Sequence, residues 1–519
     1  MRWIVLSTLI ACADPSSTPD PLAALPLPAP VETDRFRDAE TCAQCHLVGE
    51  DKTQLHDATG ANVSPVLLWR SSMMGLAARD PFYLSVFAEE LVHASDKGAV
   101  EALCTRCHAP AGSEELAIEG DHLSFDELTH GTSPAAVLGR GGVTCTLCHQ
   151  IAATNLGDER SFSGKFVVGY QRMVFGPYSD PTAEPMKLIA NFTPTYGAHM
   201  QSSELCATCH TVIVGDVVEQ ATYLEWRSSS FETTKECQSC HVPTVDSLGR
   251  SITTQVAGLD GLRARTPVGR HMFVGGNAYM LELMADAIDW VGAGIPADEL
   301  RASARRSIEH LEGAATLAIT RTTDGFTVRV SNETGHKLPT GYPSRRIWLH
   351  VVVEQGGAVL YESGAVDARG TLVDTAGQPL PRQPHRDEIL SADEVQVWEA
   401  TLVDRVGEPT HRALDARRYS KDDRILPAGY APDPIDAPRI EPIAVIADAN
   451  FLPGADTVTY KVAVPTGATI RAELQYQSLS PETVDAIAST PTAASARFVP
   501  LARARPQLPT TIARTSLVY

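Results

Sequence analysis

Five copies of one short pattern, Cys-x-x-Cys-His, constrain this chain of 519 residues more than any other feature. Its composition predicts roughly 0.007 copies by chance, so the repetition is not accidental. The copies are Cys42-Ala43-Gln44-Cys45-His46, Cys104-Thr105-Arg106-Cys107-His108, Cys145-Thr146-Leu147-Cys148-His149, Cys206-Ala207-Thr208-Cys209-His210 and Cys237-Gln238-Ser239-Cys240-His241. Two thiols three positions apart can form thioethers with a haem, and the adjacent imidazole can bind its iron. The sequence therefore predicts five covalently attached haem c groups.

Other uses of cysteine fit the pattern less well. A redox dithiol or half of a zinc site needs no histidine directly after the second cysteine, and disulfides would leave five histidines unexplained. We therefore predict thioether attachment at all ten cysteines and iron ligation by His46, His108, His149, His210 and His241. The remaining cysteine of the eleven is Cys12.

The net charge bears on the partners of the chain, and its N-terminal residues bear on its location. With 43 Lys and Arg against 63 Asp and Glu, the formal charge is −20, which argues against nucleic acid as a partner. Met1-Arg2 and the apolar stretch 3–11 resemble a signal segment, and Leu9-Ile10-Ala11-Cys12 resembles a bacterial lipobox. We expect residues 1–12 to be a lipoprotein signal ending at a lipidated Cys12, and the Pro-rich residues 13–37 to be a tether. The alternative is a short signal with an incidental cysteine.

Two domains are expected after the tether. Residues 38–313 contain all five motifs, and 200 residues for five haems leave too little chain for separate pockets, so we expect one contiguous haem array in a mostly helical or irregular domain. Helical spacing predicts helices over 81–95, 277–291 and 297–312. From residue 314 to 519 alternating segments predict an all-β, immunoglobulin-like sandwich. The expected strands are 315–321, 326–331, 345–354, 358–363, 394–403, 442–446, 457–464 and 469–477.

Several longer motifs make the chain resemble a multihaem, here pentahaem, c-type cytochrome family of bacterial envelopes with a C-terminal β-sandwich. Besides the haem motifs, they are Trp69-Arg70-Ser71-Ser72-Met73-Met74, Asp80-Pro81, His271-Met272-Phe273-Val274-Gly275-Gly276-Asn277 and Thr334-Gly335-His336-Lys337-Leu338-Pro339-Thr340-Gly341. The resemblance implies electron transfer with redox partner proteins. It does not specify a substrate.

The sixth position of each iron needs a further ligand if all irons are six-coordinate. Among the histidines outside the motifs, His199 and His271 are the first candidates, since His199 precedes Cys206 by seven residues and His271 precedes a Gly-Gly turn. His130 and His122 follow, and His56 and His93 are weaker. His336, in a tight loop between two expected strands, is the candidate from the second domain; the alternative is a hydrogen bond at the domain interface.

An internal repeat adds a further candidate. Trp69-Arg70-Ser71-Ser72 is echoed by Trp226-Arg227-Ser228-Ser229, and the resemblance implies a distal histidine five residues after each tryptophan. Met74 and Phe231 occupy those positions here. A thioether can bind haem iron whereas phenylalanine cannot, so Met74 is a candidate ligand, with core packing of Met73 and Met74 as the alternative.

These observations leave three functions open. The first is an electron relay with five six-coordinate irons between a membrane-associated donor and a periplasmic or extracellular acceptor. The second is an oxidoreductase acting on a small nitrogen or sulfur compound at one open iron. The third, compatible with the first, is a scaffold whose sandwich recruits a partner. No Cys-x-x-Cys-Lys site is present, which departs from pentahaem nitrite reductases. We favour the relay, because six histidines in or near the haem region are available for five sixth positions.

Overall fold

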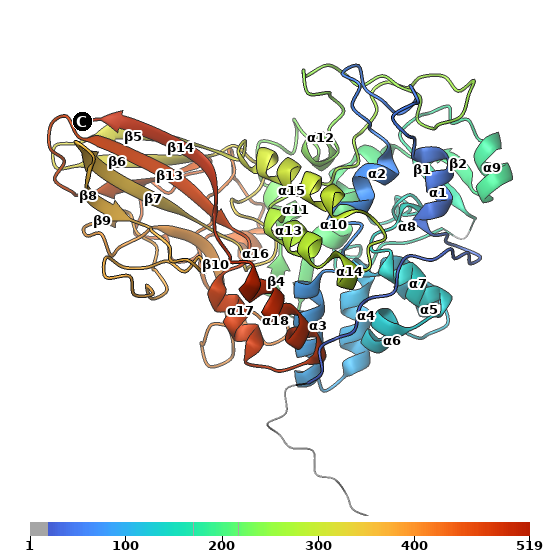
Figure 1. Cartoon of the computed structure of the whole chain (residues 1–519), viewed down its shortest axis with the longest axis horizontal. Coiled ribbons are helices and arrows are strands. Elements are labelled where there is room, and N and C mark those ends of the chain that lie inside the picture. The colour runs from blue at the N-terminus through green and yellow to red at the C-terminus, as the bar shows by residue number, and fades with distance from the viewer. Residues whose placement is uncertain (1–18, 170, 216) are drawn as a thin grey trace, which may run out of the picture.

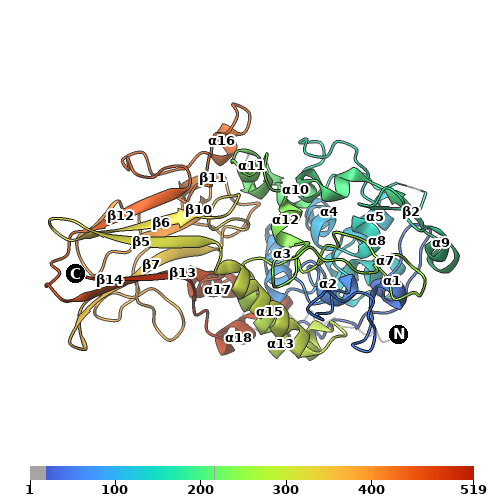
Figure 2. The same ribbon diagram turned by 90° about the horizontal axis from the view of Figure 1, so that it is seen from above.

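The computed structural model describes residues 19–169, 171–215 and 217–519. Helices gather at one end of the elongated molecule and the long strands at the other, and the C-terminus lies at the far tip of the strands (Figures 1 and 2). No helix in the described ranges is both long enough and apolar enough to span a membrane. Cys12 and the expected signal segment lie outside the described residues.

The helical end contains all five cysteine motifs and little sheet. Its helices are α1 (Ala39–His46), α2 (Pro65–Arg70), α3 (Pro81–His93), α4 (Lys97–His108), α5 (Pro110–Ala117), α6 (Phe125–His130), α7 (Pro134–Arg140), α8 (Cys145–Cys148), α9 (Glu184–Ala190), the 3-10 helix η1 (Ala198–Gln201), α10 (Ser203–His210), α11 (Thr222–Arg227), α12 (Cys237–His241), α13 (Ala278–Asp286), α14 (Ile288–Val291) and α15 (Ala297–Leu311). Its strands are the parallel pair β1 (Met173–Gly176) and β2 (Thr193–Tyr196) and the antiparallel pair β3 (Val212–Val214) and β4 (Val217–Gln220).

The other end consists mainly of two sheets. The strands are β5 (Ala315–Arg321), β6 (Phe326–Asn332), β7 (Arg346–Gln355), β8 (Ala358–Ser363), β9 (Glu388–Ile389), β10 (Val397–Val403), β11 (Arg418–Asp422), β12 (Ala455–Tyr460), β13 (Thr469–Gln477) and β14 (Thr510–Val518). One sheet has the order β11-β10-β7-β13-β14 with β8 also paired to β7, and the other has the order β5-β6-β12-β9.

The two sheets share one apolar core. Alternate residues of β6 and β12 in one sheet and of β7 and β13 in the other are buried in a single cluster that includes Phe326, Leu349, Val458 and Leu474. This is the period of two expected for strands with one face on a core. The immunoglobulin-like topology stays a prediction.

The C-terminal part differs from the all-β expectation. Within it lie α16 (Ala437–Ile440), α17 (Pro481–Ala488) and α18 (Ala493–Ala504), whereas no strand forms over 442–446. Ser480 caps α17, and Thr492 caps α18 by a reciprocal capping box. Both helices bury their apolar faces with α3, α13 and α15 in one cluster, so the end of the chain completes the core of the helical region.

The segment before the first motif is also part of this core. The backbone amide of Leu22 donates to Ala493 O (2.7 Å) and that of Leu25 to Trp290 O (2.9 Å), while the two side chains are only 3% and 4% exposed. Residues 20–37 therefore pack on the body, which differs from the expected free tether over 13–37. The reason is that Leu22 and Leu25 fill gaps beside α14 and α18.

This packing predicts a position-specific loss of stability. Replacing Leu22 or Leu25 by Ala should lower the free energy of unfolding by about 2–5 kcal/mol each, the usual cost of emptying a buried leucine site. Leu27, 67% exposed on the same segment, is the matched control, and its replacement should cost less than about 0.5 kcal/mol. Denaturant unfolding followed by circular dichroism measures the three values. Equal effects at all three positions would contradict the packing.

Candidate haem-binding cavity

The five motifs have the same local structure. Each histidine ends a helix or directly follows one: α1, α4, α10 and α12 end at the motif histidine, and α8 ends one residue before His149. Residues three apart lie on one face of a helix, so both thiols of each motif point the same way. None of the ten motif cysteines forms a disulfide in the described structure.

All ten motif cysteines and all five motif histidines line one continuous cavity of about 1320 Å³. Single small-molecule sites usually measure about 300–1000 Å³, so this space is larger than one ligand requires. Thiols of different motifs also lie within hydrogen-bonding reach of one another: Cys42 and Cys145, Cys107 and Cys209, and Cys206 and Cys237. Cys148 in turn lies near enough to Cys206 to raise its pKa, so all five motifs form one group.

Each motif histidine is oriented by a hydrogen bond at Nδ1. The partners are Val256 O for His46 (2.8 Å), Ala77 O for His108 (3.2 Å), Phe175 O for His149 (2.6 Å), the Gln220 side-chain amide for His210 (2.9 Å) and Val274 O for His241 (2.6 Å). Where Nδ1–H donates to a carbonyl, Nε2 is left as the metal-binding nitrogen and the plane of the ring is fixed. Four of the five partners are backbone carbonyls, so at those four histidines the orientation does not depend on a mobile side chain. At His210 the partner is the amide nitrogen of Gln220, which is a donor.

Burial keeps these imidazoles neutral, as iron ligands must be. It lowers the pKa of His108 and of His210 to about 4, and lowers the pKa of His46, His149 and His241 as well. Two buried polar atoms of cavity-lining residues, Tyr83 Oη and Gln238 Oε1, have no hydrogen-bond partner in the described structure. Thiol pairs, neutral imidazoles and unpaired polar atoms around one large space together fit haem groups.

Three further histidines line the cavity: His271, His310 and His336. The ring centroids of His149 and His271 lie 6.3 Å apart with their planes 23° apart. Two imidazoles that bind one metal from opposite sides place their centroids about 6 Å apart, because each metal–nitrogen bond is about 2 Å long. His271 uses Nδ1 at Gly269 O (3.1 Å), so its Nε2 is left for a metal. His149 and His271 would therefore be able to hold the same iron.

His310 was missed by the sequence analysis. It lies in the last turn of α15, after the region searched for ligands, and its ring centroid is 5.3 Å from that of His241. His336 is close enough to interact with both His310 and His241. The only sequence signal was a histidine near the end of a helix that follows the last motif.

The other candidate histidines do not line the cavity. His199 Nε2 bonds to Ile151 O (2.9 Å), and His122 Nε2 bonds to Glu101 (3.0 Å). His130 contacts Thr129 and Asp126 at the surface; His56 Nδ1 bonds to Gln54 O and His93 is exposed. Met73 and Met74 do line the cavity. In the described structure only three histidines outside the motifs line the cavity, against five motifs, which removes the reason for expecting six-coordination at every iron.

The internal repeat has equivalent structure in its two copies. The ring N–H of Trp69 and that of Trp226 each donate to a backbone carbonyl. The backbone carbonyl of each tryptophan accepts a hydrogen bond from the hydroxyl of the serine three residues later, Ser72 or Ser229 (2.7 Å in both). Phe231 lines the cavity, and its ring lies against Gly335, beside His336. A loop of the sheet region thus brings a histidine next to the position that Phe231 occupies.

Comparison with known proteins supports the fold. No protein-family model matches the chain, and no curated protein matches it. Among solved structures, the chain is similar to a penta-heme cytochrome c552 from Thermochromatium tepidum, with a TM-score of 0.53 and 18% identity over 95% of this chain and 100% of that one. The chain therefore has a multihaem cytochrome fold.

His271 and His199 were equal candidates from the sequence, but only His271 lines the cavity. His271→Ala should convert one low-spin iron to high-spin, because the His271 ring lies 6.3 Å from that of His149, centroid to centroid, and would hold the same iron. His199→Ala should leave the spin states unchanged, since its Nε2 is bound to a carbonyl. Electron paramagnetic resonance (EPR) of the two oxidised variants measures this difference. A spectrum altered by His199→Ala but not by His271→Ala would reverse the assignment.

Proposed function

We propose that the chain is an exported multihaem c-type cytochrome that transfers electrons through five covalently attached haems. The observation that carries the proposal is the single cavity lined by all five motifs. When bound there, haem supplies reversible one-electron exchange. The protein's own residues would bind each group through two thiols, orient its ligand through the bond at Nδ1, and exclude water from the shared space.

The proposal includes the kind of redox partners and the location of the protein. Electrons would pass between a membrane-associated donor and a periplasmic or extracellular acceptor protein, with Cys12 as a lipid anchor. Residues 13–19, between Cys12 and the packed segment, can span at most about 25 Å. A lipidated chain would therefore hold its folded body close to the membrane surface.

A second candidate is catalysis on a small nitrogen or sulfur compound at one open iron. It is favoured by the surroundings of His108, which stacks on Tyr83 with ring centroids 3.8 Å apart. The carboxyls of Glu90 and Glu219 lie close enough to the neighbouring Cys104 thiol to raise its pKa, after burial itself. Burial raises the pKa of Glu219 to about 7, which suits a proton donor at neutral pH.

Counting electrons and open irons tests both candidates. A reductive titration of the mature protein should take up five electrons per molecule, and uptake of four or fewer would contradict the five-haem proposal. Carbon monoxide should bind the reduced protein, because His271, His310 and His336 supply at most three of the five sixth positions and Met74 at most one more, which leaves at least one iron open. Absence of carbon monoxide binding would eliminate the catalytic candidate and leave the relay alone.

A further inference from the structure

The loop that carries His336 belongs to the sheet region but reaches the haem cavity. It joins β6 to β7, and Gly335, His336, Leu338, Pro339 and Thr340 all line the cavity. A Cβ added to Gly335 would lie 3.0 Å from Phe231 Cβ, so the loop is packed tightly against the helical region. Since His336 Nδ1 lies 2.9 Å from Lys337 O, its Nε2 is the nitrogen left for a metal.

A carboxylate of the helical region holds this loop on both sides of His336. Glu225, in α11, is fully buried; its Oε2 accepts from the backbone amide of Lys337 (3.2 Å) and from the hydroxyl of Thr340 (2.6 Å). Its Oε1 forms an ion pair with Arg424 (3.0 Å). The Glu225 side chain therefore holds the loop at two residues after His336: at the backbone amide of Lys337 and at the hydroxyl of Thr340.

The carboxylate is part of a buried, charge-balanced group of four side chains. Asp422 accepts from the Lys337 ammonium (2.7 Å) and two bonds from the Arg424 guanidinium (2.7 and 2.8 Å). With Glu225 the group has two carboxylates and two cations. Removing one member leaves a buried charge without its partner, which forces the remaining groups to rearrange.

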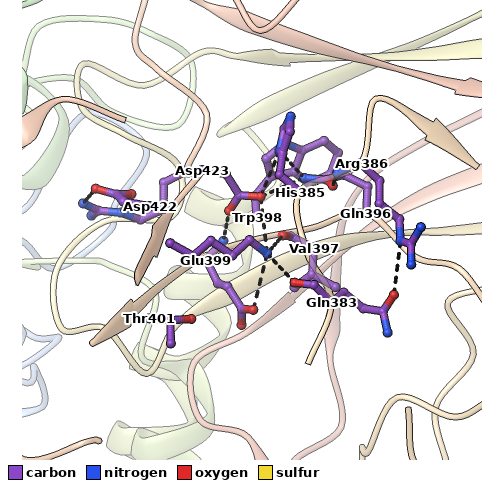
Figure 3. Close-up of polar contacts among 12 residues, drawn as sticks. Gln383, His385, Arg386, Gln396, Val397, Trp398, Glu399, Thr401, Asp422 and Asp423 are labelled. Carbon is purple, nitrogen blue, oxygen red and sulfur yellow. Dashed lines mark hydrogen bonds and ion pairs between the residues drawn. The ribbon is translucent and has the colours of Figure 1, made fainter. Parts of the chain in front are cut away.

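The far side of this group is held rigid by the sheet. Side chains alternate along an extended segment, so Asp422 faces the loop while Asp423 faces the opposite way, toward His385, Gln396 and Glu399 (Figure 3). Asp423 bonds to His385 Nδ1 (3.0 Å) and accepts from the amide of Glu399 (2.8 Å). Leu338 also exchanges two backbone hydrogen bonds with Ile425 (2.9 and 3.0 Å), which ties the loop to the segment that follows β11.

We propose that Glu225 is a positioning residue that fixes His336 as a ligand of a haem iron, so that docking of the sheet region and coordination at that iron depend on each other. The inference rests on the proposed haem function. Other buried contacts also join the two regions, such as the Arg227–Asp436 ion pair (2.5 Å). That pair uses the same helix α11 but touches no residue of the His336 loop.

The test compares Glu225→Gln with Asp436→Asn in the full-length haem-loaded protein, with His336→Ala as reference. Glutamine keeps the size of Glu225 but places an N–H group where a second acceptor oxygen stood, and it leaves the two cations with one carboxylate. We expect Glu225→Gln and His336→Ala to lose the same low-spin EPR signal, one of those in the native spectrum, and to shift the midpoint potential of the same haem. Asp436→Asn should retain that signal and that potential.

The outcomes separate the two levels of the proposal. An unchanged spectrum in His336→Ala would remove His336 as a ligand, and the inference with it, without affecting the five-electron count. A changed spectrum in His336→Ala with an unchanged one in Glu225→Gln would overturn the positioning role alone. If Glu225→Gln fails to fold, Thr340→Val removes only one bond to Glu225; it should shift the potential of the same haem, and an unshifted potential would overturn the role.

Discussion

The hydrogen bond at Nδ1 of each motif histidine is the interaction on which the rest of the arrangement depends. In four of the five motifs Nδ1 donates to a fixed backbone carbonyl, which leaves Nε2 free at the one shared space. Because the acceptors come from segments distant in sequence, such as Val256 for His46, folding of the loops between motifs and orientation of the ligands are one event.

The sheet region is structurally inseparable from that cavity. It contributes the His336 loop, and the chain after β13 returns as α17 and α18 to complete the core beneath α3 and α13. The N-terminal segment packs on α14 and α18 at the same place. The boundary near residue 314 is therefore clear in the sequence, whereas the packing of the two regions crosses it.

Local patterns predicted the elements that depend on local chemistry. The strands Ala315–Arg321, Ala358–Ser363 and Thr469–Gln477 have the bounds that alternation indicated, and α15 differs from its expected range by one residue. The strand β14 was missed because most of its side chains are half exposed and only Ile512 is buried, so alternation was weak. Helices α17 and α18 were missed because they are short and lie between the two strands β13 and β14 in an otherwise strand-rich part of the chain.

Ligand selection from the sequence was right for only some candidates: His271, His336 and Met74 line the cavity, whereas His199, His130 and His122 do not. Proximity in sequence favoured His199, seven residues from Cys206, yet axial geometry depends on which loop crosses the cavity. His271 and His310 reach it from segments that follow all five motifs, and no local pattern encodes that crossing. Glu225 gave no signal either, because a buried glutamate is recognisable only once its partners from the other end of the chain are known.

Intramolecular electron exchange tests the central claim, that five haems share one cavity, most directly. A single electron delivered by a photoexcited donor to the oxidised protein should redistribute among the haems at a rate independent of protein concentration, because neighbouring motifs are in contact. Redistribution whose rate rises in proportion to protein concentration would show that electrons pass between molecules, and would contradict a contiguous array.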